Sequence, residues 1–485
     1  PETRRGFRGV EHASARRCMH ASAAASTSLA RRCMHASAAA LYVARCACDG
    51  EAWADGFAPE GASRLLLRAL SPDHLLALPR CVASCLLTAL VPSVAAVEIA
   101  DGNVNYSFRV YRRGCRSLFL KRATGYLKWQ PSMALEAERM RREVQYYRDV
   151  AQLLGEADAD ALLPRLLHFD ERRMVVVIAF LEDHSLLIER CFASEDGVPG
   201  DAAAALGRYL GTVHGRTLER PGREAQTAER AVAYWNHALR AVQLEHVFTV
   251  CFEASERGRV LAKDAAFMSE VSELKALYLG YSLRPGDVRA LCHGDLHAGS
   301  VMVSKDGGSV KVIDPEFAVW CAPGLDVGSL LFALVCGFIF RLETCRATGS
   351  RAVGTATYPL TSLREAIARV WEAYSAALTA EGVDENAVER IGEDAVGFAM
   401  LEAIRTSLGF AGARDPGRRL TDPKALERYQ ESVVRLARRC MLGRRADRAF
   451  SANVQDGGSV FGIDLLLAEL DRAQRGIFSN TKQTP

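Results

Sequence analysis

The sequence lacks an uninterrupted apolar stretch long enough to cross a membrane. The longest uncharged stretch near that length, residues 81–97, contains Pro92 and falls short of the roughly 20 residues that a membrane-spanning helix needs. A second apolar run, residues 330–340, is shorter and is followed by Arg341. We therefore expect no transmembrane helix and no membrane partner.

Cysteine pairs at metal-binding spacing are also absent. The chain has 14 cysteines but no C-x-x-C, and its tightest pair is Cys46 and Cys48. Disulfide frameworks are typical of short secreted chains, whereas this chain has 485 residues. We therefore expect reduced thiols in an intracellular compartment. Cys292 and Cys336 lie in apolar runs, where cysteine behaves as a small hydrophobic residue.

Acidic residues are absent from His12 to Cys48, where arginine, alanine and serine predominate. Residues 1–48 carry eight arginines and two glutamates, a net charge of +6, and the rest must sum to −3 because the whole chain carries +3. A mildly acidic body argues against nucleic acid as a main partner, since nucleic-acid-binding domains are usually basic. We therefore expect no nucleic-acid partner.

The same N-terminal segment contains a repeat. The letters ARRCMHASAAA occur at residues 15–25 and again at residues 30–40. This composition resembles an organellar transit peptide, and a disordered leader or a faulty gene model are the alternatives. We treat residues 1–58 as a leader outside the folded domains. We expect a cytoplasmic protein, or an organellar one if residues 1–48 are a transit peptide.

The remaining sequence predicts a small sheet followed by a long helical region. Short strand-like runs occur at residues 94–99, 106–111 and 117–121, and a buried strand at 173–181; a helix is expected at 135–154, and mostly helices at 201–279. This order predicts an α+β fold with two lobes. We place an N-lobe at 59–182, a C-lobe at 183–476 and a polar tail at 477–485.

The strongest chemical signal lies at residues 292–317. The run CHGDLHAGSVMV is followed by a turn, KDGG, and then by VKVIDPEF. Two short strands joined by this turn would bring Asp295 and Asp314 to the same end of a hairpin. One carboxylate can then accept a proton while others hold a cation, which is the division of roles that phosphoryl transfer requires.

These letters resemble a known superfamily. HGDLH followed by a strand pair and Asp-x-Glu resembles the catalytic core of the aminoglycoside phosphotransferase and choline kinase superfamily, which has a protein-kinase-like fold. HGDLHAGS and DPEFAVWCAPGLDVG are especially similar to the methylthioribose kinase family, with HGDLHTGS and DPEFAFYGPMGFD, and VEIADGNVNYSFRV resembles that family's GDGNLNYVF. The resemblance covers about residues 60–450. It implies an ATP- and Mg²⁺-dependent homodimeric kinase that phosphorylates the 1-hydroxyl of S-methyl-5-thio-D-ribose, a step of methionine salvage.

The resemblance and elementary chemistry together assign the catalytic and metal-binding residues. Asp295 is expected to be the base that orients and deprotonates the sugar hydroxyl. Ser300 stands where most of these families place an asparagine metal ligand, and Glu316 offers a carboxylate in its place. Asp314 and Glu316 are expected to point the same way from an extended segment and to hold Mg²⁺.

A nucleotide-binding set is expected in the N-lobe. Lys121 ends the strand SLFLK, where kinases place the lysine that contacts the ATP phosphates. Glu143 is our choice of orienting partner, with Glu136 and Glu138 as rivals. By resemblance, Asn105 contacts ATP. Residues Ala179, Phe180 and Leu181 occupy the hinge position, where backbone groups can bind adenine.

The sugar-binding residues are less fully represented. The methylthioribose kinase family carries two adjacent arginines in the pattern RR-x-x-G-x-A, and the matching text here begins at Arg405, with Thr406 in place of the second arginine. By resemblance, Arg405 binds the sugar. Asp326, in the text GLDVG, resembles an aspartate that braces the catalytic loop.

Two other function classes stay open at this stage. A related kinase acting on an amino alcohol, an aminoglycoside or a ketosamine would normally carry asparagine at position 300, so Ser300 counts against it. A catalytically inactive, kinase-shaped binding protein is the other alternative. The presence of Asp295, Asp314 and Lys121 argues against inactivity.

Overall fold

The computed structural model divides into two compact units, one made of Pro1–Met140 with Arg165–Glu182 and the other of Arg141–Pro164 with Asp183–Pro485. Each unit is described by itself. The residues that the structure describes are 39–40, 42–43, 94–99, 102, 104–193, 197–222, 224–281, 283–284, 287–348, 357–409, 414–445 and 460–480. The repeat within the predicted leader lies almost wholly outside these residues.

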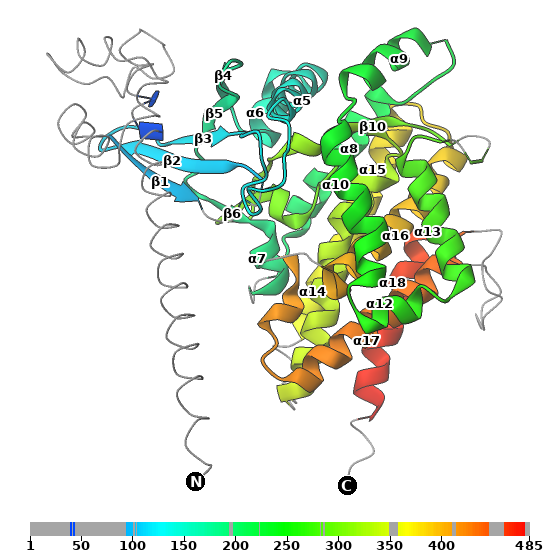
Figure 1. The fold of residues 1–485 in the computed structure, drawn as a ribbon. Helices are drawn as coiled ribbons and strands as arrows, with labels where there is room; N and C mark the ends of the chain where they lie inside the picture. Colours follow the sequence, from blue (N-terminus) through cyan, green and yellow to red (C-terminus); the bar gives the residue numbers. More distant parts are fainter. Residues whose placement is uncertain are drawn as a thin grey trace, which may run out of the picture. The chain divides into compact units, whose positions relative to one another are not determined.

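The first unit is built on a five-stranded antiparallel sheet (Figure 1). Its spatial order is β1-β2-β3-β5-β4. The strands are β1 (Val94–Ile99), β2 (Tyr106–Arg112), β3 (Leu118–Arg122), β4 (Leu166–Asp170) and β5 (Val175–Ala179). The predicted strands at 94–99, 106–111, 117–121 and 173–181 are confirmed, with shifts of a few residues at their ends.

Side-chain alternation explains which faces of these strands are buried. Along β2, Phe108 and Val110 are buried, whereas Tyr111 in the same strand is exposed. This alternation is typical of a strand with one covered face. β5 reads VVVIA and buries its first four residues in succession, as expected for a strand covered on both faces. β3 lies between β2 and β5, so Lys121 is carried by the middle strand of the sheet.

The helix predicted at 135–154 begins later than expected. Helix α5 spans Arg139–Leu154. The Arg139 guanidinium donates to the carbonyls of Leu135 at 3.2 Å and of Glu136, which stand before the helix and are therefore satisfied without a further helical turn. The hydrophobic spacing predicted the helix but not its first residue.

The second unit is mainly helical, as the sequence predicts. Its longer helices are α8 (Gly200–Thr217), α9 (Glu224–Ala233), α10 (His237–Glu245), α13 (Ala265–Tyr278), α14 (Gly324–Thr348), α15 (Thr357–Ala380), α16 (Glu385–Leu408), α17 (Pro423–Gly443) and α18 (Gly462–Asn480). Shorter helices are α6 (Glu156–Leu162), α7 (Leu187–Phe192), α11 (Cys251–Glu253) and α12 (Glu256–Leu261). A five-residue π-helix, His246–Val250, follows α10.

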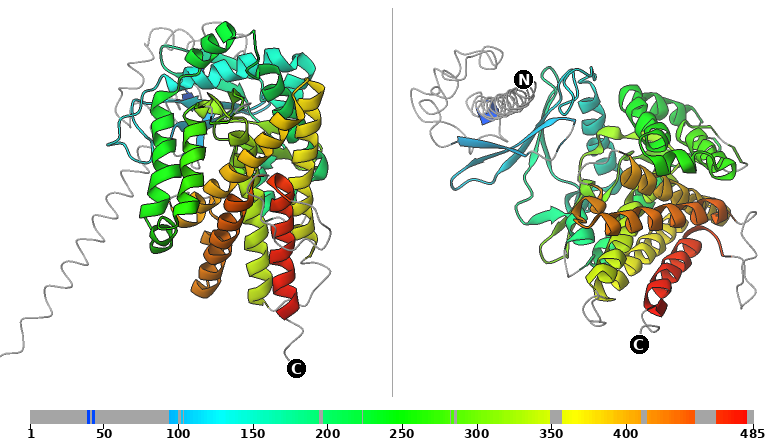
Figure 2. Two further views of the ribbon diagram at one scale, coloured as in Figure 1. Left: turned by 90° about the vertical axis from the view of Figure 1, so that its right-hand side faces the viewer. Right: turned by 60° about the horizontal axis from the view of Figure 1, so that its bottom comes forward.

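Glycines allow two pairs of these helices to pack at short range. On α8, a Cβ atom at Gly211 would lie 2.6 Å from the carbonyl oxygen of Tyr374 in α15. On α14, a Cβ atom at Gly328 would lie 2.6 Å from the carbonyl oxygen of Ala395 in α16. The pairs α8–α15 and α14–α16 pack against each other within the helical unit, which Figure 2 shows from two further sides. Small residues at these crossings let the backbones approach closely, and this fixes the helices that carry the site.

Helix α14 is apolar enough, and long enough, to cross a membrane by composition alone. Its segment Gly324–Arg346 has a mean hydropathy of 1.9, but 94% of that window is buried inside the protein. The run predicted at 330–340 is thus part of a longer helix than the sequence suggested. Its burial is that of a core helix, packed against α15, α16 and α17.

Two short sheets surround the motif at 292–317. β8 (Val301–Ser304) pairs antiparallel with β9 (Val310–Val312) and with β6 (His184–Leu186), while β7 (Ala290–Cys292) pairs with β10 (Val319–Cys321). The predicted hairpin is therefore confirmed. Gly307 in its turn has φ 77°, a left-handed conformation that glycine adopts readily.

An antiparallel sheet in one unit and a mainly helical second unit confirm the predicted α+β class. The predicted domain boundaries stay predictions. The compact units differ from them because residues 141–164 group with the helical unit. Helix α18 also continues to Asn480, into the segment predicted as a polar tail.

Candidate active site

The loop between β7 and β8 is held by a buried carboxylate. Asp326, in the first turn of α14, accepts hydrogen bonds from the backbone N–H of His293 at 2.6 Å and of Gly294 at 2.9 Å. Gly294 has φ 84°, and a Cβ atom there would collide with the backbone of Phe317. Asp326 therefore braces this loop, as its position in the sequence suggested.

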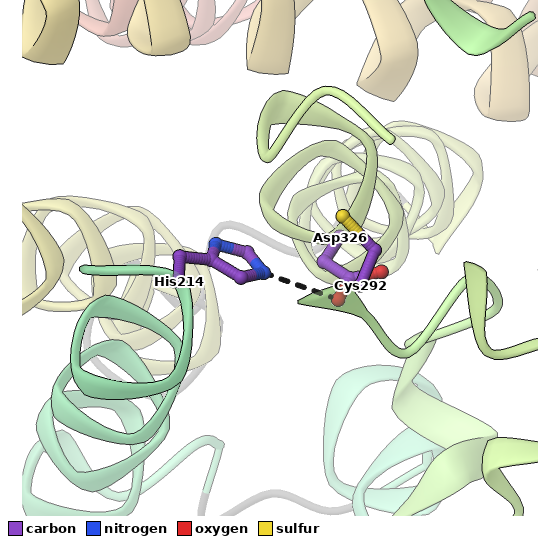
Figure 3. A group of neighbouring side chains, drawn as sticks. All are labelled: His214, Cys292 and Asp326. Atoms are coloured by element: carbon purple, nitrogen blue, oxygen red, sulfur yellow. Dashed lines mark hydrogen bonds and ion pairs between the residues drawn. The ribbon is translucent and has the colours of Figure 1, made fainter. Parts of the chain in front are cut away.

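Asp326 is itself oriented by a histidine that the sequence did not single out. His214 Nε2 lies 3.3 Å from Asp326 Oδ2, and His214 Nδ1 lies 3.0 Å from the Tyr374 hydroxyl. Figure 3 shows the His214 ring directed at the Asp326 carboxylate. Side chains of α8, α14 and α15 thus form one buried chain of hydrogen bonds behind the loop.

Cys292 lies beside this pair, and the three side chains could in principle hold a metal ion (Figure 3). Their existing contacts argue against that. Both Asp326 oxygens accept backbone N–H groups, and the Cys292 thiol lies 3.6 Å from the carbonyl oxygens of Cys321 and Ala322. Burial raises the pKa of the Cys292 thiol well above its usual value, whereas metal binding needs a thiolate. We therefore interpret His214, Cys292 and Asp326 as a structural group that holds the loop.

Asp295 forms a bidentate ion pair with an arginine from a distant part of the chain. Arg414 Nη1 donates to Asp295 Oδ1 at 3.0 Å, and Arg414 Nη2 donates to Oδ2 at 2.7 Å. Burial alone would raise the pKa of Asp295, but the charge of Arg414, with a smaller contribution from Arg405, outweighs it and lowers the pKa to about 2. Asp295 is therefore ionised at neutral pH and able to accept a hydrogen bond from a hydroxyl group.

His297 stands next to Asp295 as a neutral side chain. Its Nε2 atom lies 3.8 Å from Asp295 Oδ2, and its Nδ1 atom accepts the N–H of Gly299 at 2.8 Å. Burial, followed by the charge of Arg414, holds the pKa of His297 well below its usual value. His297 therefore shapes the loop and adds no charge at neutral pH.

Backbone contacts join the loop to the start of the segment that carries Asp314. His293 Nε2 donates to the Ile313 carbonyl at 2.9 Å, and the Ile313 N–H donates to the Ser300 carbonyl at 2.9 Å. The Tyr146 ring meets the His293 ring edge-on, with centroids 5.6 Å apart. The hairpin therefore ties the two ends of the motif together, the arrangement that its spacing suggested.

Three carboxylates gather at the end of this hairpin. One oxygen each of Glu143, Asp314 and Glu316 lie within 4.8 Å of one another, and Glu143 and Glu316 are buried. Carboxylate oxygens are the ligands that Mg²⁺ prefers, so this donor set fits that ion. Glu143 was predicted to orient Lys121, and that role stays a prediction. The structure adds that its carboxylate belongs to the same group as the predicted metal ligands.

The expected extended conformation at Asp314 is wrong. Residues Pro315–Phe317 form a 3-10 helix, and Asp314 before it is left-handed, with φ 67° and ψ 45°. The turn is held by Asn236 Nδ2, which donates to the Glu316 carbonyl at 2.7 Å, and it brings the carboxylates of Asp314 and Glu316 to one side.

The Ser300 hydroxyl donates to the Asp295 carbonyl at 3.0 Å, so its proton is already engaged within the loop.

Asn105 of the predicted nucleotide set is fixed by a buried arginine in the sheet unit. Its side-chain oxygen accepts from Arg139 Nε at 3.1 Å and from Arg139 Nη2 at 2.7 Å. Arg139 also donates to the Thr124 carbonyl at 2.9 Å. The oxygen of Asn105 is therefore engaged within the sheet unit.

The remaining nucleotide residues lie on β3 and at the end of β5. Lys121 is buried on β3, opposite Val176. The Ala179 N–H donates to the Arg165 carbonyl at 2.9 Å and the Phe180 N–H to the Ser117 carbonyl at 3.2 Å. An adenine at the hinge would therefore have to use other groups, such as the carbonyls or the Leu181 N–H. The Arg109 guanidinium covers the Phe180 ring at 4.5 Å.

Arg405 and Thr406 lie in the last turn of helix α16. Arg405 Nη1 donates to Glu402 Oε2 at 2.7 Å, and the Arg405 side chain is only 14% exposed, which excludes an ordinary surface arginine. Burial opposes its charge, but the carboxylates of Glu402 and Asp295 raise the pKa of Arg405. Thr406 is 1% exposed, and its hydroxyl has no hydrogen-bond partner among the described residues. Arg405 thus faces the charge of Asp295, whereas Thr406 is packed away.

Sequence reasoning missed Arg414, His214 and Arg139. Arg414 follows the RR-x-x-G-x-A text by a few residues, in a stretch with four arginines and no strong periodicity. His214 lies on an ordinary helical face. Arg139 sits in a charge-rich helix start, where most charged residues face solvent. Nothing in the sequence marked these three, because their partners are far away along the chain.

The chain is similar to known phosphotransferases. The family described as "Phosphotransferase enzyme family" matches residues 95–375. A methylthioribose kinase of Exiguobacterium sibiricum is 31% identical, over 71% of this chain and 85% of the relative. Methylthioribose kinases of Pectobacterium carotovorum and Klebsiella pneumoniae are 28% and 27% identical, over 71% and 66% of this chain and 84% and 82% of the relatives.

Solved structures show a weaker likeness. A microcompartment-associated aminopropanol kinase matches with a TM-score of 0.41 and 15% identity, over 71% of this chain and 92% of that chain. A Plasmodium vivax ethanolamine kinase matches with a TM-score of 0.40 and 12% identity, over 77% and 89% of the two chains. Likeness at this level says nothing about the acceptor.

Proposed function

This chain belongs to the phosphotransferase enzyme family, and we propose that it is an ATP- and Mg²⁺-dependent kinase of S-methyl-5-thio-D-ribose. The product would be the 1-phosphate of that sugar. The proposal places the protein in methionine salvage. The relatives' shared name supports the acceptor, and the loop with its nearby carboxylates supports the chemistry.

The observation that carries the reaction type is the ionised Asp295 at the end of a hairpin that also presents the three-carboxylate group. An ionised carboxylate in the catalytic loop can orient an attacking hydroxyl and receive its proton. Separate carboxylates can hold the cation that phosphoryl transfer needs. Asp295 is engaged by Arg414, and Asp314, Glu316 and Glu143 form the other group, so the two roles fall to different side chains.

In the proposed reaction, the 1-hydroxyl oxygen of the sugar forms a bond to the γ-phosphorus of ATP. The bond between that phosphorus and the β,γ-bridging oxygen breaks, ADP leaves, and the hydroxyl proton passes to Asp295. When bound by the carboxylate group, Mg²⁺ would neutralise charge on the phosphates. Arg405 would donate to sugar oxygens, since a guanidinium presents donors in a fixed fork.

The nucleotide roles belong to the same proposal. Lys121 would contact the α- and β-phosphates and Asn105 would contact the nucleotide. Ala179, Phe180 and Leu181 would read adenine through the backbone groups that the sheet leaves available. A homodimer in the cytoplasm, or in an organelle if residues 1–48 are a transit peptide, completes the proposal. Light scattering and fractionation of cells that express the full chain would test these two points.

Steady-state assays with ATP and a panel of acceptors test the function. We expect phosphorylation of S-methyl-5-thioribose with a kcat/KM at least a hundredfold above that for ribose, choline or an aminoglycoside. ³¹P NMR of the product should show a phosphate on the anomeric oxygen. Preference for choline or an aminoglycoside would move the protein to another acceptor class. ATP binding without turnover of any acceptor would favour a kinase-shaped binding protein.

A further inference from the structure

Asp295 accepts hydrogen bonds from both terminal nitrogens of Arg414, which lies 119 residues further along the chain. The fork of Arg414 reaches both carboxylate oxygens, at 3.0 Å and 2.7 Å. The two side chains are only 23% and 13% exposed, so solvent screens the pair weakly. Bidentate arginine–carboxylate pairs of this kind fix orientation as well as charge.

Besides Arg414, one guanidinium acts on the charge of Asp295, that of Arg405 on helix α16. Arg405 is bonded to Glu402 and acts on Asp295 through its charge, with no hydrogen bond to that carboxylate among the described residues. Thr406, the next residue of α16, is neutral and buried. The second positive charge near Asp295 therefore comes from Arg414, outside α16.

We infer that Arg414 is a positioning residue for phosphoryl transfer, which fixes the carboxylate of Asp295 through hydrogen bonds to both of its oxygens. The inference deepens the proposed kinase function and rests on it. A carboxylate offers about four lone-pair sites and the fork of Arg414 uses two. An acceptor hydroxyl can therefore still bind Asp295 while Arg414 stays in place.

The charges around Asp295 show why such a residue is needed. Burial favours the protonated carboxyl, which cannot accept a proton. The groups that face Asp295 are Arg414, Arg405 on α16, His297 and His293 in its own loop, and Tyr278 on α13. His297 is neutral at pH 7 and the charge of Arg405 is shared with Glu402, so Arg414 makes the largest contribution to the charged state.

The test compares Arg414→Met and Arg414→Gln with wild type across pH. The acid limb of kcat/KM reports the free enzyme's essential base. Removing an adjacent opposite charge raises the pKa of an aspartate, typically by about 1–3 units. The base must be ionised to act, so the acid limb should move to higher pH by at least about one unit. From a pKa of about 2, such a rise places the limb between about pH 3 and pH 5, so kcat/KM of Arg414→Met relative to wild type should be lower at pH 4 than at pH 7, by up to about tenfold.

Two other variants separate positioning from folding. Arg414→Lys keeps the charge but loses the fork, so it should leave the acid limb near its wild-type position while kcat falls. Arg419→Met is the matched control: Arg419 lies close by in the chain but bonds Glu189 at 2.9 Å. It should change neither the limb nor kcat. A loss in the Arg414 variants that is equal at all pH values would overturn the inference.

A measurement without turnover makes the inference independent of the acceptor. In protein labelled with ¹³C at aspartate carboxyl carbons, with Asp295→Asn for assignment, the Asp295 signal should titrate at higher pH in Arg414→Met than in wild type. An unchanged titration would overturn the inference even if the kinase function holds. Conversely, the wild-type enzyme could fail to phosphorylate methylthioribose while the Asp295 titration still differs between wild type and Arg414→Met. That result would contradict only the proposed acceptor.

Discussion

Asp295 shows how one side chain depends on its immediate charges. Burial works against its ionised form, and the fork of Arg414 restores it. The same carboxylate must remain open to a hydroxyl. A carboxylate with a pKa of about 2 is a weak proton acceptor, so its main contribution would be to orient the hydroxyl in a loose transition state.

Replacing Asp295 by asparagine tests this role. The amide keeps the size of the side chain but cannot take a proton, so kcat should fall by about 10²–10⁴-fold while the Kd for ATP stays within about threefold. Steady-state kinetics and calorimetric ATP titration measure both quantities. Asp183→Asn, at an exposed carboxylate paired with Lys305, is the control and should behave as wild type. If Asp295→Asn keeps more than about a tenth of kcat, the residue is not the base.

The carboxylate group yields a second prediction. Glu316→Gln replaces an anionic ligand by a neutral one, and hard cations prefer charged oxygen ligands. The Mg²⁺ concentration for half-maximal rate should rise about tenfold or more, with a smaller change in the rate at saturating Mg²⁺. Titrating the rate with Mg²⁺ at fixed ATP gives the answer. An unchanged Mg²⁺ dependence would show that Glu316 is only a loop residue.

Arg405 gives a third prediction at this scale. Arg405→Ala removes the donors expected to meet the sugar, so the KM for methylthioribose should rise about tenfold or more and kcat should fall, while the KM for ATP stays nearly constant. Arg405→Lys should recover only part of the loss, because lysine lacks the fork. Measuring both KM values in both variants decides the role. A rise in the KM for ATP alone would contradict it.

At the scale of elements, the loop is positioned by helices packed at glycine contacts. His214 on α8 reaches Asp326 on α14 and Tyr374 on α15, so the spacing of these helices sets the brace behind the loop. Gly211 lies one turn before His214 and touches the Tyr374 backbone. A change at this crossing should therefore be felt both in stability and at Asp326.

Gly211→Ala tests the crossing of α8 and α15. Its Cβ atom would lie 2.6 Å from the Tyr374 carbonyl and 2.6 Å from Ala377 Cβ, so the helices must shift, at a cost of about 1–3 kcal/mol of the free energy of unfolding. Urea unfolding followed by circular dichroism measures this loss. Gly200→Ala in the same helix meets no atom within 4 Å and should be neutral or slightly stabilising. Equal stability of the two variants would show that the helices do not need the glycine.

At the scale of the whole chain, buried ion pairs connect distant segments of the helical unit. Arg444, just after α17, is fully buried and donates to Glu270 on α13 at 3.0 Å and to Asp394 on α16 at 2.9 Å. Arg284 bonds the same Asp394 at 2.9 Å. These contacts join residues that lie 174 and 50 positions from Arg444 in sequence.

Arg444→Met tests this connection. Methionine keeps much of the apolar volume but removes the hydrogen bond to Glu270, which retains the longer contact with Arg445 at 3.7 Å. Breaking a buried pair typically costs about 3–5 kcal/mol, and we expect a loss at the lower end of that range. The midpoint of urea unfolding should fall accordingly. Arg257→Met is the control, because Arg257 is 34% exposed and its pairs with Glu427 and Glu431 should contribute at most about 1 kcal/mol. If Arg444→Met lowers the free energy of unfolding no more than the control, the prediction is wrong, and water must solvate the carboxylates in place of the arginine.

The sequence by itself determined the features that depend on neighbours along the chain. Alternation of apolar residues located β2 and β5, and the turn at Gly307 located the β8–β9 hairpin. The motif letters pointed to Asp295, Asp314 and Glu316 as the chemical residues. These signals are local, because strand periodicity and turn chemistry act over a few residues.

Only the tertiary structure decided the features that depend on residues far apart in sequence. The 3-10 turn at Asp314 replaced the expected extended segment, and Glu143 joined its carboxylate group. Arg414 became the partner of Asp295, while Thr406 was buried with no hydrogen bond from its hydroxyl among the described residues. The pKa of Asp295 follows from burial and a guanidinium 119 positions away. Electrostatic and packing energies depend on distance in space, and a sequence pattern specifies only distance along the chain.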